Sequence, residues 1–182
     1  AVCYLRAMKK LRLEELGRLS VSAFQTVKKL PVVILLDNVR SLHNVGSAFR
    51  TADAFSLEKI LLTGITGTPP HREIHKTALG ATESVWWEYV ESPALAVQQL
   101  KDNGYQIWAV EQTTESTPLN QFVPLQSQPY CLIFGNEING VSDEVLALAD
   151  GALEIPQSGT KHSLNIAVCV GIVSWHFAQA LR

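Results

Sequence analysis

The stretch from Pro31 to Phe55 reads PVVILLDNVRSLHNVGSAFRTADAF. Its apolar run at 32–36 predicts a buried strand, and the amphipathic stretch that begins near Asn44 predicts a helix. The polar side chains between and just after these elements are Asp37, Asn38, Arg40, His43, Asn44 and Arg50. Because α/β proteins place their chemistry beyond the carboxyl ends of strands, this stretch predicts an α/β fold with a functional site at its first strand end.

The composition is that of a globular protein. The 182 residues suffice for one domain with a sizeable core, and 47% of them are hydrophobic and 18% charged. Three cysteines without a CxxC spacing argue against a zinc knuckle and fit a reducing compartment. The longest apolar stretch, 164–180, is interrupted by polar residues, and no signal-peptide pattern is seen. We therefore expect a cytoplasmic protein without a membrane span.

The net charge of −2 is unevenly distributed along the chain. Residues 1–30 carry seven basic and two acidic side chains, whereas the remainder carries eight basic and fifteen acidic ones. We expect residues 1–30 to form a basic helical appendage, with an amphipathic helix over 8–19, and residues 31–182 to form the main domain. The appendage is either a phosphate-contacting element or a solvated surface helix.

Strands and helices alternate after residue 31. The pattern predicts strands at 32–36, 59–62, 85–89, 105–110, 130–134 and 152–155, with helices at 44–54, 70–79, 93–103, 142–149 and 163–180 and a long polar loop at 112–129. Short strands that alternate with helices indicate a mostly parallel sheet covered by helices on both faces.

Two further polar clusters follow predicted strands. The second runs from Gly135 to Gly140, and glycines at such a junction let the backbone approach a ligand closely. The third runs from Ile155 to Asn165, into the start of the last helix, where free N–H groups attract polar ligand atoms. Neither contains a GxGxxG, P-loop or GxSxG pattern, so these sequences disfavour a Rossmann oxidoreductase, a P-loop NTPase and an α/β-hydrolase.

Two other groups of side chains leave alternatives open. His71 and His75 have the spacing of two zinc ligands, but the intervening glutamate is one place too late for HExxH and Arg72 disfavours a cation, so we expect no metal. The aromatic residues of the 85–89 strand could stack on bases, although aromatics in a strand more often belong to the core or an interface.

Taken in order, the three clusters resemble the three motifs of the SpoU (TrmH-like) RNA 2′-O-methyltransferases, which belong to the SPOUT class. The matching residues are Asn44-x-Gly46-x-x-x-Arg50, Phe134-Gly-Asn-Glu137-x-x-Gly140, Ile155-Pro156 and Ser163-Leu-Asn165. The resemblance implies a C-terminal deep trefoil knot, a homodimer with the site near its interface, and S-adenosyl-L-methionine as cofactor. It implies an enzyme that methylates a ribose 2′-hydroxyl of transfer or ribosomal RNA.

The same resemblance assigns the site residues. Arg50, Asn44, Glu137, Ser163 and Asn165 match the catalytic residues of the family. The cofactor-binding positions are Gly135, Asn136, Gly140, Ile155, Pro156 and Leu164.

Physical chemistry narrows the roles of two of these residues. Arginine is effectively never deprotonated, so we expect Arg50 to fork onto a phosphate or the developing alkoxide while phosphate or water takes the proton. We expect Glu137 to accept hydrogen bonds from Asn44 or from loop N–H groups rather than to transfer a proton, because its ordinary pKa is far below that of a hydroxyl. His43 is an alternative base.

Substrate capture and the activity itself have alternatives. Many members of the family carry a separate N-terminal RNA-binding domain, whereas about 30 residues precede the first strand here. Capture of the RNA would then fall to the basic appendage, the dimer surface or a helper protein. A non-catalytic knotted RNA-binding protein and a base methyltransferase of the same class are the alternative functions.

Overall fold

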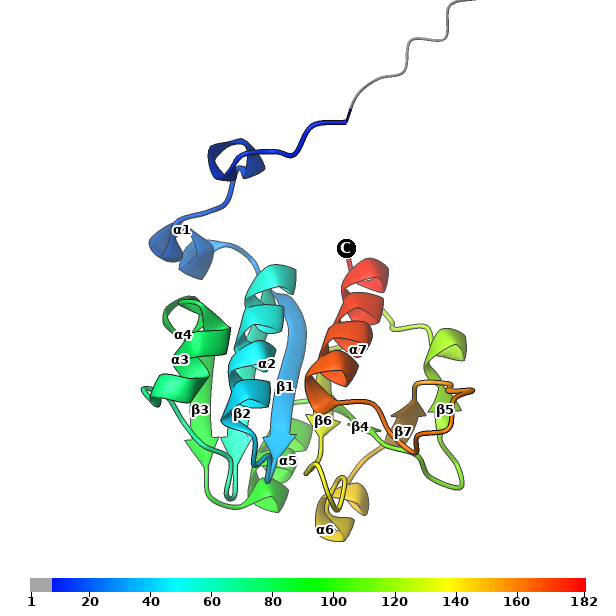
Figure 1. Cartoon of the computed structure of the whole chain (residues 1–182). Coiled ribbons are helices and arrows are strands. Elements are labelled where there is room, and N and C mark those ends of the chain that lie inside the picture. Colours follow the sequence, from blue (N-terminus) through cyan, green and yellow to red (C-terminus); the bar gives the residue numbers. More distant parts are fainter. Residues whose placement is uncertain (1–7) are drawn as a thin grey trace, which may run out of the picture.

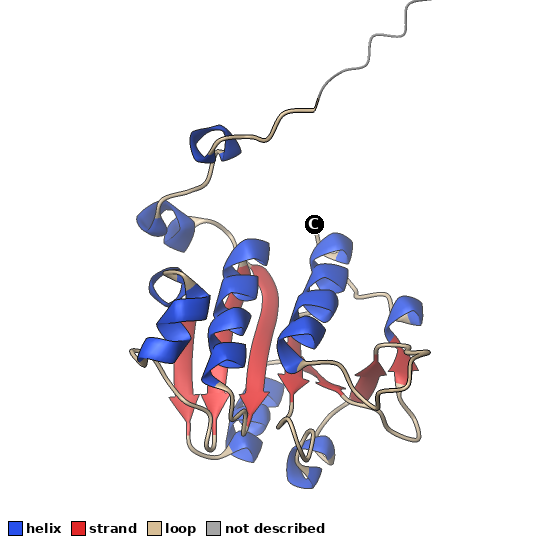
Figure 2. Ribbon diagram, viewed as in Figure 1, coloured by secondary structure: helices blue, strands red, loops and turns tan. Residues whose placement is uncertain are grey.

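Seven parallel strands form one sheet in the computed structural model, which describes residues 8–182. The strands lie in the order β3-β2-β1-β6-β4-β7-β5, and every neighbouring pair is parallel. They are β1 (Leu30–Asp37), β2 (Leu57–Thr63), β3 (Trp86–Val90), β4 (Gln106–Val110), β5 (Thr117–Pro118), β6 (Tyr130–Phe134) and β7 (Gly151–Glu154). Helices cover both faces of the sheet, which confirms the predicted fold class (Figures 1 and 2).

The helices fall into two layers. They are α1 (Val21–Thr26), α2 (Leu42–Phe55), α3 (Arg72–Ala78), α4 (Ala81–Ser84), α5 (Pro93–Asp102), α6 (Asp143–Leu146) and α7 (Ile166–Ala180), with 3-10 turns η1 (Leu13–Leu16) and η2 (Leu119–Gln121). Residues of α2, α3, α4 and α7 share one buried cluster, and residues of α5 and α6 share the other. No helix of residues 8–182 is long and apolar enough to cross a membrane.

Strand β1 lies in the interior of the sheet, between β2 and β6, and its side chains are apolar on both faces. Ile34 packs into the cluster with α2 and α7, and its neighbour Leu35 packs into the cluster with α5. The strand pairs with β2 on one side and with β6 on the other, where Leu36 is in register with Phe134. This pairing brings the first and second polar clusters, almost 100 residues apart in the chain, to one edge of the sheet.

The predicted helix over 8–19 is wrong. The chain forms only the 3-10 turn η1 there, ends it at Gly17 in a left-handed conformation (φ +59°), and begins α1 after the cap residue Ser20. Leu11 and Leu19 are exposed, so an amphipathic helix at this position has no apolar surface to pack against. A short helix is marginal in water without such packing.

Helix α7, helix α6 and one loop also differ from the predictions. Helix α7 begins at Ile166 rather than at 163, because the Asn165 side chain accepts a hydrogen bond from the Ala167 N–H and caps the helix there. Helix α6 follows the cap residue Ser142, whose side chain makes no capping hydrogen bond, and ends at Leu146 instead of at 149. The 112–129 loop contains the short strand β5 and the turn η2.

Candidate active site

Buried polar contacts join the loops after β1 and β6. The Asp37 carboxylate, 1% exposed, accepts hydrogen bonds from the Asn38 side-chain amide and the Ser142 N–H, and the donor–acceptor distance is 2.8 Å in each. The Asn136 side-chain amide donates to the Asn38 carbonyl over 2.7 Å. These contacts hold the first and second clusters against each other in a fixed arrangement.

Glu137 is the central acceptor between these clusters. Its carboxylate accepts from the N–H groups of Arg40 (3.0 Å) and Ser41 (2.9 Å) and from the side-chain amide of Asn44 (3.0 Å). Burial by itself raises the pKa of Glu137, but the hydrogen bonds from Arg40, Ser41 and Asn44 outweigh it, and the pKa lies below its ordinary value. The group is therefore ionised at neutral pH and accepts three hydrogen bonds, which confirms the hydrogen bonds that we predicted for it.

Asn44 links the second cluster to the third. Its side chain is almost fully buried, and its Oδ1 accepts a hydrogen bond from the Asn165 amide over 3.3 Å while its Nδ2 donates to Glu137. Asn165 is fixed in turn because its Oδ1 caps α7. The chain Glu137–Asn44–Asn165 thus brings together three of the five predicted catalytic residues.

A cavity of about 690 Å³ lies beside this chain of hydrogen bonds. The segments that line it come from the ends of β4, β6 and β7 and from the loop before α7, and they include Glu137, Ser163 and Asn165. The predicted cofactor-binding residues that line it are Gly135, Asn136, Gly140, Ile155 and Leu164. Pro156 lies in the chain between two lining residues and does not itself line the cavity.

The wall of the cavity near Gly135 consists of backbone. A Cβ atom at Gly135 would overlap the backbone of Gly140 and Val141, and Gly140 has a φ of +70° that favours glycine. Asn136 and Gly140 exchange two backbone hydrogen bonds of 2.8 and 2.9 Å, which close the turn. This geometry leaves the loop no room for a side chain at Gly135 and makes the loop a backbone cradle.

Arg50 does not reach this cavity within one chain. It follows Asn44 by six residues on α2, which places the two side chains about 9 Å apart along the helix axis and about 120° apart around it. Arg50 instead lines a separate hollow of about 470 Å³ against α3 and α7. Among the ion pairs found in residues 8–182, none involves Arg50.

The sequence analysis missed Glu111, which lines the cavity at the end of β4. Its carboxylate accepts from the N–H groups of Val141 (3.1 Å) and Gln112 (2.8 Å) and so supports the second cluster. The side chain of Gln112 donates to the His162 carbonyl over 2.7 Å and ties the third cluster to β4. The signal was available, because Glu111 and Gln112 are polar residues that directly follow a predicted strand.

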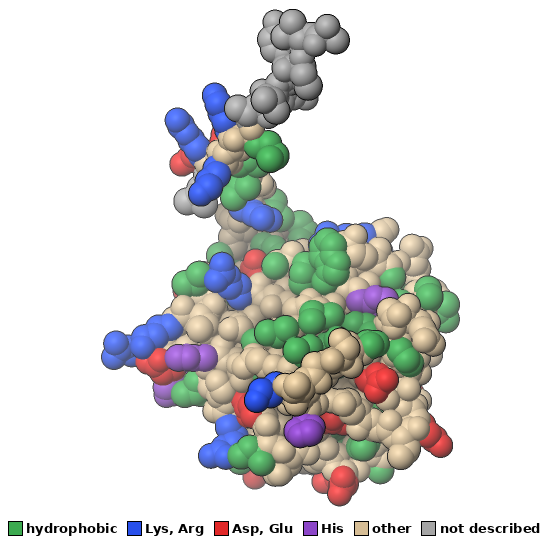
Figure 3. Space-filling view, turned by 45° about the vertical axis from the view of Figure 1, so that its right-hand side comes forward, with side chains coloured by type: hydrophobic (Ala, Val, Ile, Leu, Met, Phe, Trp, Pro, Cys, Tyr) green, Lys and Arg blue, Asp and Glu red, His purple; other side chains and the backbone are tan. Residues whose placement is uncertain are grey.

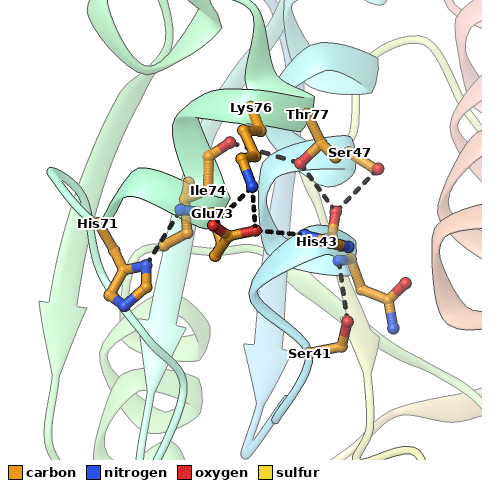
Figure 4. A network of polar contacts seen from close by, with 9 residues as sticks. Ser41, His43, Ser47, His71, Glu73, Ile74, Lys76 and Thr77 are labelled. Atoms are coloured by element: carbon orange, nitrogen blue, oxygen red, sulfur yellow. Dashed lines mark hydrogen bonds and ion pairs between the residues drawn. The ribbon is translucent and has the colours of Figure 1, made fainter.

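The histidines and aromatic residues have other surroundings. His71 caps α3 by accepting from the Glu73 N–H, and His43 lies 2.8 Å from the Glu73 carboxylate and points toward α3 (Figure 4). No group of three or more metal-ligating side chains was found among residues 8–182. Trp87 packs edge-on against Phe49, with 6.4 Å between the ring centroids.

Residues 31–175 match the sequence model of the SpoU rRNA Methylase family. The tRNA (guanosine(18)-2′-O)-methyltransferase of Thermus thermophilus is 30% identical over 142 residues, which are 78% of this chain and 71% of that protein. The 23S rRNA (guanosine-2′-O-)-methyltransferase RlmB of Nitrosomonas europaea is 29% identical over 141 residues, which are 78% of this chain and 53% of that protein.

Solved structures of RNA-modifying enzymes have a fold similar to that of this chain. The TrmH/SpoU tRNA modifying enzyme of A. aeolicus superposes with a TM-score of 0.75 at 27% identity, over 84% of this chain and 76% of that one. The AdoMet-bound rRNA methyltransferase of Sinorhizobium meliloti gives 0.78 at 26% identity, over 87% of this chain and 60% of that one.

Proposed function

Because the chain belongs to the SpoU rRNA methylase family, we propose that it transfers the methyl group of S-adenosylmethionine to a ribose 2′-hydroxyl of transfer or ribosomal RNA. The observation that carries this proposal is the Glu137–Asn44–Asn165 chain of hydrogen bonds, whose two end residues line a cavity built from three strand ends. Asn44 of the first cluster thereby connects polar residues of the second and third clusters that face one ligand-sized space. We propose further that the enzyme acts in the cytoplasm. We also propose that its C-terminal region forms the trefoil knot of the family.

The cavity fits the cofactor in size and charge. Its 690 Å³ lies within the range of small-molecule sites. S-adenosylmethionine carries a sulfonium and an ammonium against one carboxylate, and the lining contains four carboxylates but neither lysine nor arginine. Gly135, Ile155 and Leu164 would hold it, largely through backbone groups. When bound, the cofactor supplies a methyl group that is already activated by the sulfonium.

The protein's own task is to orient the acceptor hydroxyl and to ease loss of its proton. Glu137 is a positioning residue, because its carboxylate is occupied by three donors and its lowered pKa makes it a weak base. Asn44 and Asn165 are fixed by it and by the cap of α7, and Ser163 stands exposed at the cavity. Arg50 binds a phosphate or the developing alkoxide, and the proton leaves to phosphate or water.

We infer that a second copy of the chain completes the site. Helix α7 exposes an apolar strip, Val168, Ile172 and Trp175, whose spacing places the three side chains on one face. The hollow that holds Arg50 adjoins this helix through Gly171. A homodimer that buries the strip would remove it from water and carry Arg50 of one copy toward the cavity of the other.

RNA capture by the enzyme falls to basic surfaces. Residues 8–20 project from the domain, and exposed cations of the segment before β1 gather at that end of the molecule (Figures 1 and 3). They include Lys9, Lys10, Arg12, Arg18 and Lys28. This segment would bind phosphates without sequence preference, and a helper protein would add selectivity.

The decisive test is methyl transfer from labelled cofactor to total tRNA and total rRNA of a strain that lacks this gene. We expect label in nucleosides whose 3′ linkage resists alkaline hydrolysis, as a 2′-O-methyl group requires. Label in a base would overturn ribose methylation. Cofactor binding by calorimetry without incorporation into either RNA pool would instead indicate a non-catalytic member of the family.

A further inference from the structure

The hollow beside Arg50 has the opposite character to the cofactor cavity. It lies between α2, α3 and α7 and has a volume of about 470 Å³. Its lining contains two cations, three hydroxyl groups and no carboxylate: Ser47, Arg50, Thr51, Ala54, Phe55, Lys76, Thr77 and Gly171. The cofactor cavity is therefore suited to a cationic methyl donor, and the hollow beside Arg50 is suited to an anion.

Lys76 is held at this hollow by Glu73. Its Nζ lies 2.8 Å from one carboxylate oxygen of Glu73 and 3.0 Å from the other, and the same carboxylate meets His43 Nε2 at 2.8 Å (Figure 4). About half of the Lys76 side chain and more than half of that of His43 are exposed. Exposed ion pairs of this kind are weak, so Lys76 can exchange Glu73 for another anion at little loss.

The wall that carries these groups is fixed. The His43 carbonyl accepts a hydrogen bond from Thr77 Oγ1 (3.0 Å), which joins α2 to α3, and another from Ser47 Oγ (2.8 Å) within α2. Gly46 lets the two helices approach, because a Cβ there would overlap Thr77 and the Ile74 carbonyl. The backbones that carry Arg50 and Lys76 are thus held at a constant separation across the hollow.

We propose that this hollow binds a phosphodiester group of the substrate RNA, and that Lys76 leaves Glu73 to share that phosphate with Arg50. The proposal rests on the proposed function and names the residue that helps Arg50 to hold the RNA strand. A phosphate suits the lining because cations and hydroxyl groups bind its oxygens and no lining residue is a carboxylate that would repel it. Glu73, outside the lining, keeps Lys76 in place until the RNA arrives.

Four variants test the proposal: Lys76→Ala, Lys76→Arg, Glu73→Gln and the control Lys59→Ala. Lys59 also forms an exposed ion pair, with Glu88 at 3.0 Å, and belongs to β2, so its loss removes the same charge away from the hollow. The probes are total tRNA and total rRNA from a strain that lacks this gene. The readouts are kcat and KM for methyl transfer, RNA binding by filter retention over a salt series, and sedimentation.

We expect Lys76→Ala to raise the KM for RNA roughly tenfold with kcat nearly unchanged, because a ground-state phosphate contact is lost. The slope of log affinity against log salt should fall by about 0.7, the value for one phosphate of a single strand. Lys76→Arg should restore most of the affinity, and Lys59→Ala should behave as the wild type. Glu73→Gln should lower the KM, because it removes the competing anion.

Three results would overturn the proposal. One is a KM for Lys76→Ala no higher than that of Lys59→Ala. Another is a KM raised equally by Glu73→Gln, which would show that the ion pair itself matters. The third is a changed dimer dissociation constant with unchanged RNA binding, which would make the hollow a protein contact. Filter retention reports on Lys76 even where no methyl is transferred, so failure of the proposed function is recognised separately.

Discussion

The side-chain amide of Asn44 donates a hydrogen bond to Oε1 of Glu137 over 3.0 Å, although 93 positions separate the two residues in the chain. The same carboxylate accepts from the N–H groups of Arg40 and Ser41, at the turn between β1 and α2. One side chain of the loop after β6 therefore holds the turn that leads into α2 and orients Asn44. This relationship makes Glu137 the point at which structure and activity can be perturbed together.

Glu137→Gln should destabilise the fold and reduce activity. An amide offers one acceptor oxygen in place of two, so at least one donor among Arg40, Ser41 and Asn44 is left without its partner. We expect the free energy of unfolding in urea to fall by about 1–3 kcal/mol at pH 7. Methyl transfer should fall about a hundredfold, because Asn44 loses its orientation. Glu115→Gln, at an exposed loop position, is the control and should change neither quantity.

The contribution of Glu137 to stability should depend on pH with a definite sign. Its pKa is lower in the folded protein than the ordinary value of 4.5, so the unfolded chain binds the proton more tightly. The stabilisation is present above pH 4.5 and is lost as the pH falls through the folded pKa. The difference in unfolding free energy between the wild type and Glu137→Gln should therefore shrink below pH 4.5. A difference that stays constant down to pH 3 would contradict this account.

Gly135→Ala should weaken cofactor binding, because the new Cβ overlaps the backbone of Gly140 and Val141 and the turn must open. We expect calorimetry to show at least a tenfold weaker affinity for S-adenosylmethionine. Gly159→Ala is the matched control, since a Cβ there meets nothing within 4 Å. Unchanged affinity in Gly135→Ala would show that the backbone cradle is not the cofactor site.

The sequence predicts the sheet well because its strands are locally distinctive. The continuous apolar runs of β1 and β6 are typical of strands buried on both faces, and β6 was predicted with its observed bounds, Tyr130–Phe134. The junction of the two strand ends follows from parallel pairing, so the neighbourhood of Asn44 and Glu137 was accessible from the sequence. The prediction of a helix over 8–19 failed because the amphipathic segment has no surface to pack against. The local sequence pattern does not reveal whether such a surface exists.

The candidate site was predicted less completely than the sheet. Glu111 was overlooked because its importance lies in hydrogen bonds to loop N–H groups 30 positions away, at Val141. The separation of Arg50 from the cavity depends on the direction of its side chain around α2, and the matching motif alone carries no such information. Tertiary contacts therefore decide the roles that residue types and spacing leave open.

Ile172→Glu should separate the proposed dimer into monomers. The new charge lies in the middle of the exposed strip of α7, where burial against a second copy would leave it without a partner. Sedimentation should show the mass of one chain, while the circular dichroism spectrum stays that of the wild type. The control is Val123→Glu, which places the same charge at an exposed apolar residue in a loop and should stay dimeric. A wild type that sediments as a monomer would contradict the dimer.

Arg50 is expected to act on the cavity of the other copy. Arg50→Ala should abolish methyl transfer and leave the affinity for S-adenosylmethionine within a few-fold, because Arg50 does not line the cofactor cavity. Arg50→Lys should lose most of the activity too, since lysine lacks the planar guanidinium group that donates two hydrogen bonds side by side. Calorimetry that shows equal loss of cofactor binding would contradict this division of roles.

Heterodimers with one substitution in each chain test whether Arg50 acts in the cavity of its own copy or in that of the other copy. A dimer of one Arg50→Ala chain and one Asn165→Ala chain, isolated through two affinity tags, contains one intact site if Arg50 acts across the interface. It should then show about half of the wild-type activity, although each parent homodimer is inactive. If Arg50 reached its own cavity, both sites would carry a defect and the heterodimer would be inactive. A heterodimer of wild-type and Arg50→Ala chains sets the half-activity reference, since it keeps one intact site under either arrangement.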